Sequence, residues 1–259
     1  MGAATFNLER LRTGLSPYRL HFFSRLRSTN DHAARLRREG RLFAPAVVLT
    51  PRQTAGRGRG TNQWWSSSGD QVLTVTFVLA ADEHLPPHEL PLIAGIAVRE
   101  AAVELTDRAG IELKWPNDVL FKGRKLAGIL CERVSRADLI GVGMNLNLDP
   151  RRAPAGLREK VTSLQTIANR RIDPTDAVIS LGRLLWEATR RRSQQPFGLF
   201  VEAYQRHHAL TGKRVSIISN DGSPPLRGRV REIDEQGRLV LADGGKVHRI
   251  IAGQVVMGE

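Results

Sequence analysis

The chain has 259 residues, of which 41% are hydrophobic and 25% charged, which excludes the collagen-like, low-complexity and intrinsically disordered classes. Its single cysteine, Cys131, excludes a disulfide framework or a cysteine metal site within one chain. The formal net charge of +13 favours an anionic partner, whether a nucleic acid, a nucleotide phosphate or an acidic protein.

The first 60 residues carry much of this charge, with twelve arginines, no lysine and three acidic residues. A solvated basic surface is an equally good interpretation, because net charge does not fix a binding site. The N-terminus lacks the apolar stretch of a signal peptide, and no window approaches the ~20 apolar residues of a spanning helix. We therefore expect a cytoplasmic protein.

Short strands and helices alternate in the first half of the chain. Residues 5–18 are a polar lead-in with weak structural signal, and residues 53–69 are too rich in Gly, Arg and Ser to be anything but a loop. Ser28 is placed to cap a helix. The pattern predicts strands over 18–23, 46–50 and 72–79, and helices over 29–38 and 90–109.

The second half begins with further strands, expected over 111–115, 119–121, 125–134 and 139–148. The turn Lys122-Gly123 predicts a hairpin. Two helices follow, over 174–192 and 197–208, the first opened by Asp173-Pro174. From Thr211, turns at 220–222, 234–237 and 243–245 predict a small β-barrel of about 50 residues, with a domain boundary near Leu210.

The loop Gln53-Thr54-Ala55-Gly56-Arg57-Gly58-Arg59-Gly60 is the most informative segment. Its glycines let the backbone approach a ligand, and its two guanidiniums offer forked donors to carboxylate or phosphate oxygens. It is no Walker A motif, because no Gly-Lys-Ser/Thr follows. The segment predicts an anion site gripped by side chains, and a basic loop that touches RNA nonspecifically is the alternative.

Two later segments carry polar groups at strand ends. Lys114-Trp115-Pro116-Asn117-Asp118 combines a cation, an aromatic plane, an amide and a carboxylate, and Lys125-Leu126-Ala127-Gly128-Ile129-Leu130 brings a second lysine. Such a set can position a nucleotide and a hydrated Mg²⁺, although a plain strand end and turn give the same pattern. Gly141-Val142-Gly143-Met144-Asn145 suggests close approach of a strand to a ligand.

Together these segments resemble the biotin protein ligases. The glycine-arginine loop, Lys-Trp-Pro-Asn-Asp, Lys-Leu-Ala-Gly-Ile-Leu and Gly-Val-Gly-x-Asn follow in the family's order and at similar spacing. Ser28-Thr29-Asn30 and Thr162-Ser163-Leu164 match two further family elements, and the resemblance covers about residues 20 to 259. It implies an α+β fold of the class II synthetase and biotin–lipoate ligase type, in which helices back a mixed sheet.

The resemblance also implies a catalytic domain over 1–210, an SH3-like barrel over 211–259 and a two-step reaction. Biotin and MgATP give biotinyl-5′-adenylate, and a lysine of a biotin carboxyl carrier domain then takes the biotinyl group. The implied biotin-binding residues are Ser28, Thr29, Asn30, Gln53, Arg57, Gly58, Arg59 and Lys125. The implied nucleotide-binding residues are Arg57, Trp64, Lys114, Trp115, Asn117, Asp118 and Asn145. Arg59, Lys114 and Lys125 would be catalytic, and no protein metal site is expected.

One position departs from the family loop, because Asn62 stands where the family usually has a third arginine. This raises the question of whether the loop closes over the adenylate, and we expect Arg57 and Arg59 to close it. Fewer than 30 residues precede Ser28, so we expect a ligase of the monofunctional type, without a DNA-binding domain or a specific operator. Monomer and homodimer both remain open.

Two alternatives remain. A lipoate ligase would share the fold but matches the motifs less well. A nucleic-acid-binding module would explain the charge, but only 5% of the residues are aromatic, which disfavours a stacking platform.

Overall fold

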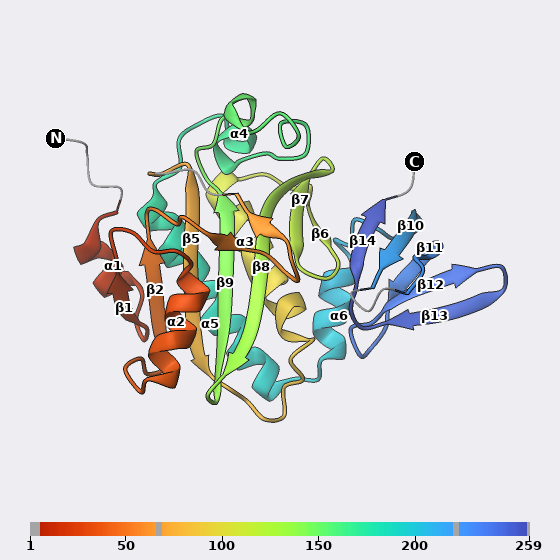
Figure 1. The fold of residues 1–259 in the computed structure, drawn as a ribbon, viewed down its shortest axis with the longest axis horizontal. Helices are drawn as coiled ribbons and strands as arrows, with labels where there is room; N and C mark the ends of the chain where they lie inside the picture. Colours follow the sequence, from red (N-terminus) through yellow and green to blue (C-terminus); the bar gives the residue numbers. More distant parts are fainter. Residues whose placement is uncertain (1–5, 66–68, 220–222, 258–259) are drawn as a thin grey trace.

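The computed structural model describes residues 6–65, 69–219 and 223–257. A seven-stranded sheet with the order β1-β2-β5-β9-β8-β7-β6 forms the centre of the larger domain (Figure 1). β1 pairs with β2 in parallel and every other neighbouring pair is antiparallel, so the sheet is mixed as expected. Its strands are β1 (Arg19–Phe22), β2 (Ala46–Thr50), β5 (Val72–Ala80), β6 (Ile111–Lys114), β7 (Asp118–Phe121), β8 (Arg124–Val134) and β9 (Ala137–Asn145).

Helices cover both faces of this sheet. On one face lies α2 (Thr29–Arg38), which begins where Ser28 Oγ accepts the backbone N–H of Asp31 at 3.3 Å. The opposite face carries the long helices α3 (Leu90–Thr106) and α5 (Pro174–Gln194), visible behind the sheet in Figure 1. Because both faces are covered, the interior strand β5 is buried along its length except at its last residue. The shorter helices are α1 (Leu8–Gly14), α4 (Leu164–Ala168) and α6 (Gly198–Gln205).

The C-terminal domain is a five-stranded antiparallel unit with the order β13-β12-β11-β10-β14, on the right in Figure 1. This confirms the expected small β-domain. The predicted turns at 234–237 and 243–245 join its strands, whereas the predicted turn at 220–222 lies outside the described residues. The strands are β10 (Arg214–Ile218), β11 (Leu226–Ile233), β12 (Leu239–Asp243), β13 (Lys246–Ile250) and β14 (Gln254–Met257).

The structure differs from the sequence-based elements in several places, among them the predicted strand 139–148, which is β9 and ends at Asn145, and the predicted helix 197–208, which is α6 and ends at Gln205. The lead-in segment contains α1, capped by Asn7, whose side chain accepts the backbone N–H of Arg10. The predicted loop contains a short hairpin made of two strands of two residues each, β3 (Gly56–Arg57) and β4 (Gln63–Trp64). Helix α3 stops at Thr106 because Asp107 takes the left-handed conformation, with φ of 53°. Between β9 and α5, the short helix α4 and a 3₁₀ turn (Pro150–Arg152) were not predicted.

Among the described residues, no helix combines the length and the apolar character that crossing a membrane requires. The two domains meet beside β6. The indole of Trp115 and the imidazole of His88 contact the backbone carbonyls of Gly237 and Gln236, at 3.0 Å each. The turn between β11 and β12 therefore packs against the segment that follows β6.

Candidate active site

A cavity of about 300 Å³ opens between the sheet, the glycine-arginine loop (residues 53–64) and the C-terminal domain. It collects the motifs that lie far apart in the sequence. Every residue assigned to a substrate from the sequence lines this cavity except Asn145: Ser28, Thr29, Asn30, Gln53, Arg57, Gly58, Arg59, Trp64, Lys114, Trp115, Asn117, Asp118 and Lys125.

Small polar groups form one end of the cavity, at the start of α2. Gln53 Oε1 accepts the backbone N–H of Thr29 at 2.9 Å, which fixes the side chain of Gln53 against the helix. Ser28, Thr29 and Asn30 are each less than 5% exposed. Uncharged donors and acceptors held in this way suit a neutral polar ring system rather than a phosphate.

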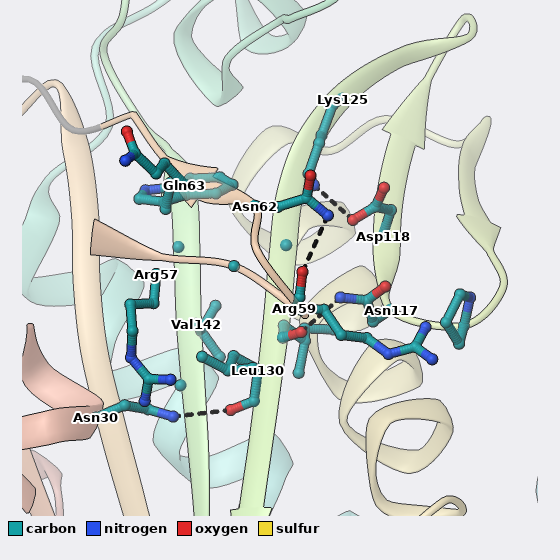
Figure 2. Close-up of a pocket in the computed structure, with 18 of the residues that line it drawn as sticks. Asn30, Arg57, Arg59, Asn62, Gln63, Asn117, Asp118, Lys125, Leu130 and Val142 are labelled. Atoms are coloured by element: carbon teal, nitrogen blue, oxygen red, sulfur yellow. Dashed lines mark hydrogen bonds and ion pairs between the residues drawn. The ribbon is translucent and has the colours of Figure 1, made fainter. Parts of the chain in front are cut away.

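The two loop arginines point to opposite ends of the cavity. In Figure 2 the side chain of Arg57 runs toward Asn30, and that of Arg59 runs past Asn117. Arg59 Nη1 donates to the carbonyl oxygen of Gly253, in the C-terminal domain, at 3.1 Å. Burial lowers the pKa of Arg59, and the charge of Asp118 opposes that shift. A guanidinium stays protonated even so, which leaves Arg59 as a half-buried cation.

Arg57 already has anionic partners inside the protein. Its Nη2 lies 2.6 Å from Asp31 Oδ1 and 2.9 Å from Glu132 Oε2. Burial disfavours its charge, but the hydrogen bonds and charges of Glu132 and Asp31 raise its pKa. Arg57 also lines the cavity, so its expected contact with a ligand anion stays a prediction beside these internal ion pairs. What Arg57 does here is fasten the loop to α2 and β8.

The other cations gather around a single carboxylate. Lys125 Nζ lies 2.6 Å from Asp118 Oδ1, and Lys114 is the cross-strand neighbour of Asp118 in the register of β6 and β7. Burial lowers the pKa of Lys114, partly offset by the charge of Asp118 and reinforced by that of Lys125. Lys114, Lys125 and Arg59 therefore bring three positive charges to one wall of the cavity, against one negative charge. This excess is suited to an anionic ligand.

Trp64 lines the cavity, and its ring packs against Gly143 of β9. A Cβ atom added to Gly143 would come within 2.4 Å of the Trp64 ring, so glycine is required there by close packing. Lys125 Nζ lies 5.5 Å from the centre of the same ring, within range of a cation–π contact. The Gly-Val-Gly strand thus approaches a side chain of the loop, where the sequence had suggested only a ligand.

Three residues expected beside the nucleotide have structural partners. Asn145 Nδ2 donates to the carbonyl oxygens of Thr162, at 2.9 Å, and Lys125, at 3.3 Å, so it supports the Lys125 backbone from behind the cavity lining. Asn117 Nδ2 donates to the carbonyl of Ile129 at 2.8 Å. The side chain of Trp115 is 2% exposed and its N–H bonds to the C-terminal domain, so it has little surface to offer a base.

Asn62, the departure from the family loop, closes the turn of the hairpin. Its Nδ2 donates to the carbonyl of Arg59 at 2.9 Å, and its own carbonyl accepts the N–H of Gly58 at 2.7 Å. The turn of the hairpin is therefore closed without a third arginine.

Sequence reasoning missed three groups of residues. Gly253, Gln254 and Val255 reach the cavity from the C-terminal domain, and only the tertiary structure brings them there. Glu132 has no motif of its own, although it follows the Lys125–Leu130 segment on the same strand. Thr74 lines the cavity from β5, a strand whose sequence predicts a fully buried element.

The described residues contain no group of three or more His, Cys, Asp or Glu side chains that could hold a metal ion. Asp118 is the single carboxylate among the described residues that line the cavity. Such a set fits a metal ion carried mainly by a substrate phosphate, since Mg²⁺ in nucleotide sites usually keeps waters and takes only one or two protein carboxylates.

Comparison with known proteins supports the same assignment of both domains. Residues 22–149 match the model of the Biotin/lipoate A/B protein ligase family, and residues 210–258 match the Biotin protein ligase C terminal domain. The chain is 34% identical over 217 residues to a biotin--[acetyl-CoA-carboxylase] ligase of Mycobacterium tuberculosis, covering 81% of this chain and 78% of the relative.

Two further matches bear on the extent and the fold of the chain. It is 30% identical to the bifunctional ligase/repressor BirA of Bacillus subtilis, covering 82% of this chain but 66% of that protein. The chain thus spans just under two thirds of that relative. The solved structure of a biotin protein ligase from Aquifex aeolicus in complex with biotin and ATP superimposes with a TM-score of 0.81 at 25% identity, covering 93% of this chain and 98% of that one.

Proposed function

The chain belongs to the biotin protein ligase family, and we propose how its cavity carries out the ligase reaction. The enzyme activates biotin with ATP to biotinyl-5′-adenylate and transfers the biotinyl group to a protein lysine. The observation that carries the assignment is the convergence in one cavity of the glycine-arginine loop, the Lys114–Asp118 segment and Lys125. The acceptor is a lysine of a biotin carboxyl carrier domain.

The first step joins two anions. A carboxylate oxygen of biotin attacks the α-phosphorus of ATP, and the bond to the bridging oxygen breaks as pyrophosphate leaves. Arg59, Lys114 and Lys125 reduce the repulsion between the reacting groups and stabilise the charge at phosphorus. No enzyme nucleophile is needed. Cys131 is unsuited to that role in any case, because burial raises the pKa of its thiol far above the ordinary range.

In the second step the neutral amine of the carrier lysine attacks the carboxyl carbon of the mixed anhydride. A C–N bond forms, the C–O bond to the phosphate breaks, AMP leaves, and the nitrogen releases one proton to solvent. We assign Lys125 to contact both the carboxyl and the phosphate, and its position in the cavity beside Asp118 and the Trp64 ring supports this role. The same cations therefore stabilise the departing AMP.

We assign the substrates to opposite ends of the cavity. The uncharged groups of Ser28, Thr29, Asn30 and Gln53 bind the ring system of biotin, and the cationic wall binds the phosphates of ATP. Asp118 would hold a hydrated Mg²⁺ that ATP brings with it, which supplies charge neutralisation at the phosphates. The catalytic domain ends near Leu210 and the C-terminal domain follows.

A lipoate ligase is the runner-up, because the family that matches residues 22–149 includes both activities. The match of residues 210–258 to a biotin-specific domain favours biotin. An ATP–pyrophosphate exchange assay with each acid separates the two. Label should enter ATP with biotin and not with lipoate, and exchange with lipoate alone would replace the proposed function with the runner-up.

A further inference from the structure

Glu132 lies outside the cavity lining, yet it connects two residues that line it. Both of its carboxylate oxygens accept from Arg57 Nη2 at 2.9 Å, and Oε2 also accepts from Asn30 Nδ2 at 2.9 Å. Its side chain is 29% exposed. A carboxylate shared between an amide and a guanidinium fixes the distance between them more firmly than either contact alone.

Asn30 is the fixed end of this connection. Its side chain is buried, its Oδ1 accepts the hydroxyl of Thr76 at 2.6 Å, and its Nδ2 also donates to the carbonyl of Leu130 at 3.2 Å. A Cβ atom at Gly141 would lie 2.2 Å from Oδ1, so strand β9 leaves space for the amide. Asn30 therefore has one orientation, with its N–H group directed at Glu132.

Arg57 is the movable end, because it belongs to the loop. It lies on β3, and the pairs Gly56–Trp64 and Arg57–Gln63 make β3 and β4 one hairpin. Fixing the Arg57 side chain thus fixes the backbone of the hairpin and, through it, the place of Trp64 in the cavity lining. Figure 2 shows Arg57 directed toward Asn30 and away from Lys125 and Asp118.

We infer that Glu132 is a positioning residue that couples Asn30, at the biotin end of the cavity, to Arg57, and thereby holds the glycine-arginine loop over bound biotin and biotinyl-adenylate. The inference rests on the proposed function, since it names a residue that serves the same site through others. Loss of the coupling lets the hairpin open more often and therefore speeds the release of biotin and biotinyl-adenylate. The phosphate-binding wall of Arg59, Lys114 and Lys125 stays intact.

Asp31 offers a comparison within the same ion pair. It contacts the same Arg57 nitrogen as Glu132, but it is 51% exposed, and the coupling to Asn30 runs through Glu132. If Glu132 served only to neutralise Arg57, then Asp31→Asn and Glu132→Gln would have equal effects. If the coupling matters, Glu132→Gln has much the larger effect, because the amide presents donors where Arg57 and Asn30 need an acceptor.

The test measures the dissociation rates of biotin and of biotinyl-adenylate from the full-length enzyme by rapid dilution, with the KM for ATP alongside. We expect Glu132→Gln to raise both dissociation rates about tenfold, the change that loss of a charged hydrogen bond brings. The KM for ATP should change less than twofold and Asp31→Asn should raise the rates less than threefold. Glu104→Gln removes an ion pair with Arg183 far from the cavity and should leave the rates as in the wild type.

If Glu132→Gln fails to fold, Arg57→Lys is the second variant. It keeps the charge but not the forked donor, so it should raise the same two dissociation rates and leave the KM for ATP unchanged within twofold. In the double variant the two effects should not add, as expected for one contact. Equal rates for Glu132→Gln and Asp31→Asn, or a parallel rise in the KM for ATP, would overturn the inference. A wild-type enzyme that forms no adenylate from biotin would overturn the proposed function instead.

Discussion

The indole N–H of Trp115 donates a 3.0 Å hydrogen bond to the carbonyl oxygen of Gly237, and this bond joins the two domains beside Lys114. Trp115 directly follows Lys114, and it is buried in the junction. The position of the Lys114–Asp118 segment therefore depends on how the turn between β11 and β12 packs against it. The C-terminal domain takes part in the site through this turn and through the contact of Gly253 with Arg59.

Gly237→Ala should disturb this junction. Its φ of 75° is unfavourable for alanine, and a Cβ atom would lie 2.8 Å from Leu92 and 3.0 Å from Phe197. Gly123→Ala is the control, because its φ is 74° but a Cβ atom there meets nothing within 4 Å. Both variants should lose about 1 kcal/mol from backbone strain. Gly237→Ala should lose about 1–3 kcal/mol more from overpacking, in denaturant unfolding, and should alone raise the KM for ATP several-fold.

Arg59→Gly should release biotinyl-adenylate into solution. Arg59 is the half-buried loop cation, and its bond to Gly253 ties the loop to the C-terminal domain. The measurement is stray biotinylation of a bystander protein such as serum albumin, mixed with enzyme, biotin and ATP. We expect a clear increase over the wild type and over Arg108→Gly, which lies outside the cavity lining. Unchanged labelling would count against the closure of the loop through Arg59.

Most strands and long helices could be predicted from the sequence because their signals are local. Asp173-Pro174 and Ser28 mark helix starts by their own side chains, and Lys122-Gly123 takes the left-handed turn that a tight hairpin needs, with φ of 50° and 74°. The helix α1 was missed because its stability comes from distant contacts. Its packing depends on Leu11, which is fully buried, and the side chain of Arg10 pairs with Asp173 and Asp176.

The candidate site was likewise predicted only in part. The motifs indicated which residues gather in the cavity, but not how each side chain is used. The internal partners of Arg57 could not be foreseen, because Asp31 and Glu132 are 26 residues before it and 75 residues after it in the chain. The partners of Asn145 could not be foreseen either, because the backbone carbonyls that accept its N–H group come from other segments. Tertiary packing brings these partners together, so the spacing of residues in the sequence does not predict them.

Gly143→Ala tests whether close packing on Gly143 holds the Trp64 side chain in place. The added methyl would overlap the indole, at 2.4 Å, and the loop would have to lift. We expect biotin to bind at least about tenfold more weakly by calorimetry, as when one well-packed contact is lost. Gly95→Ala is the control, because its Cβ would make only ordinary contacts, the nearest at 3.5 Å, inside helix α3. It should keep wild-type affinity and gain about 0.5–1 kcal/mol of stability. Wild-type affinity in Gly143→Ala would mean that Trp64 is free to leave its place.

His208 should make the domain junction sensitive to acid. It is 9% exposed, it bridges to Leu113 of β6, and burial, with a contribution from Lys213, lowers its pKa to about 4. An unfolded histidine titrates near 6.5, so the unfolded chain binds more protons between these two values. Stability is therefore complete above about pH 6.5 and falls as the pH drops toward 4, by about 3 kcal/mol in total for this one group.

The variant His208→Phe should lack this part of the pH dependence while keeping a ring against Tyr204, whose centre lies 5.7 Å from that of His208. Denaturant unfolding at pH 7.5 and pH 5 measures the difference. The wild type should lose more stability on acidification than His208→Phe, and His84→Phe, at an exposed position, should behave as the wild type. Equal losses in the wild type and His208→Phe would mean that His208 is protonated in the folded protein, and that the junction accommodates its charge.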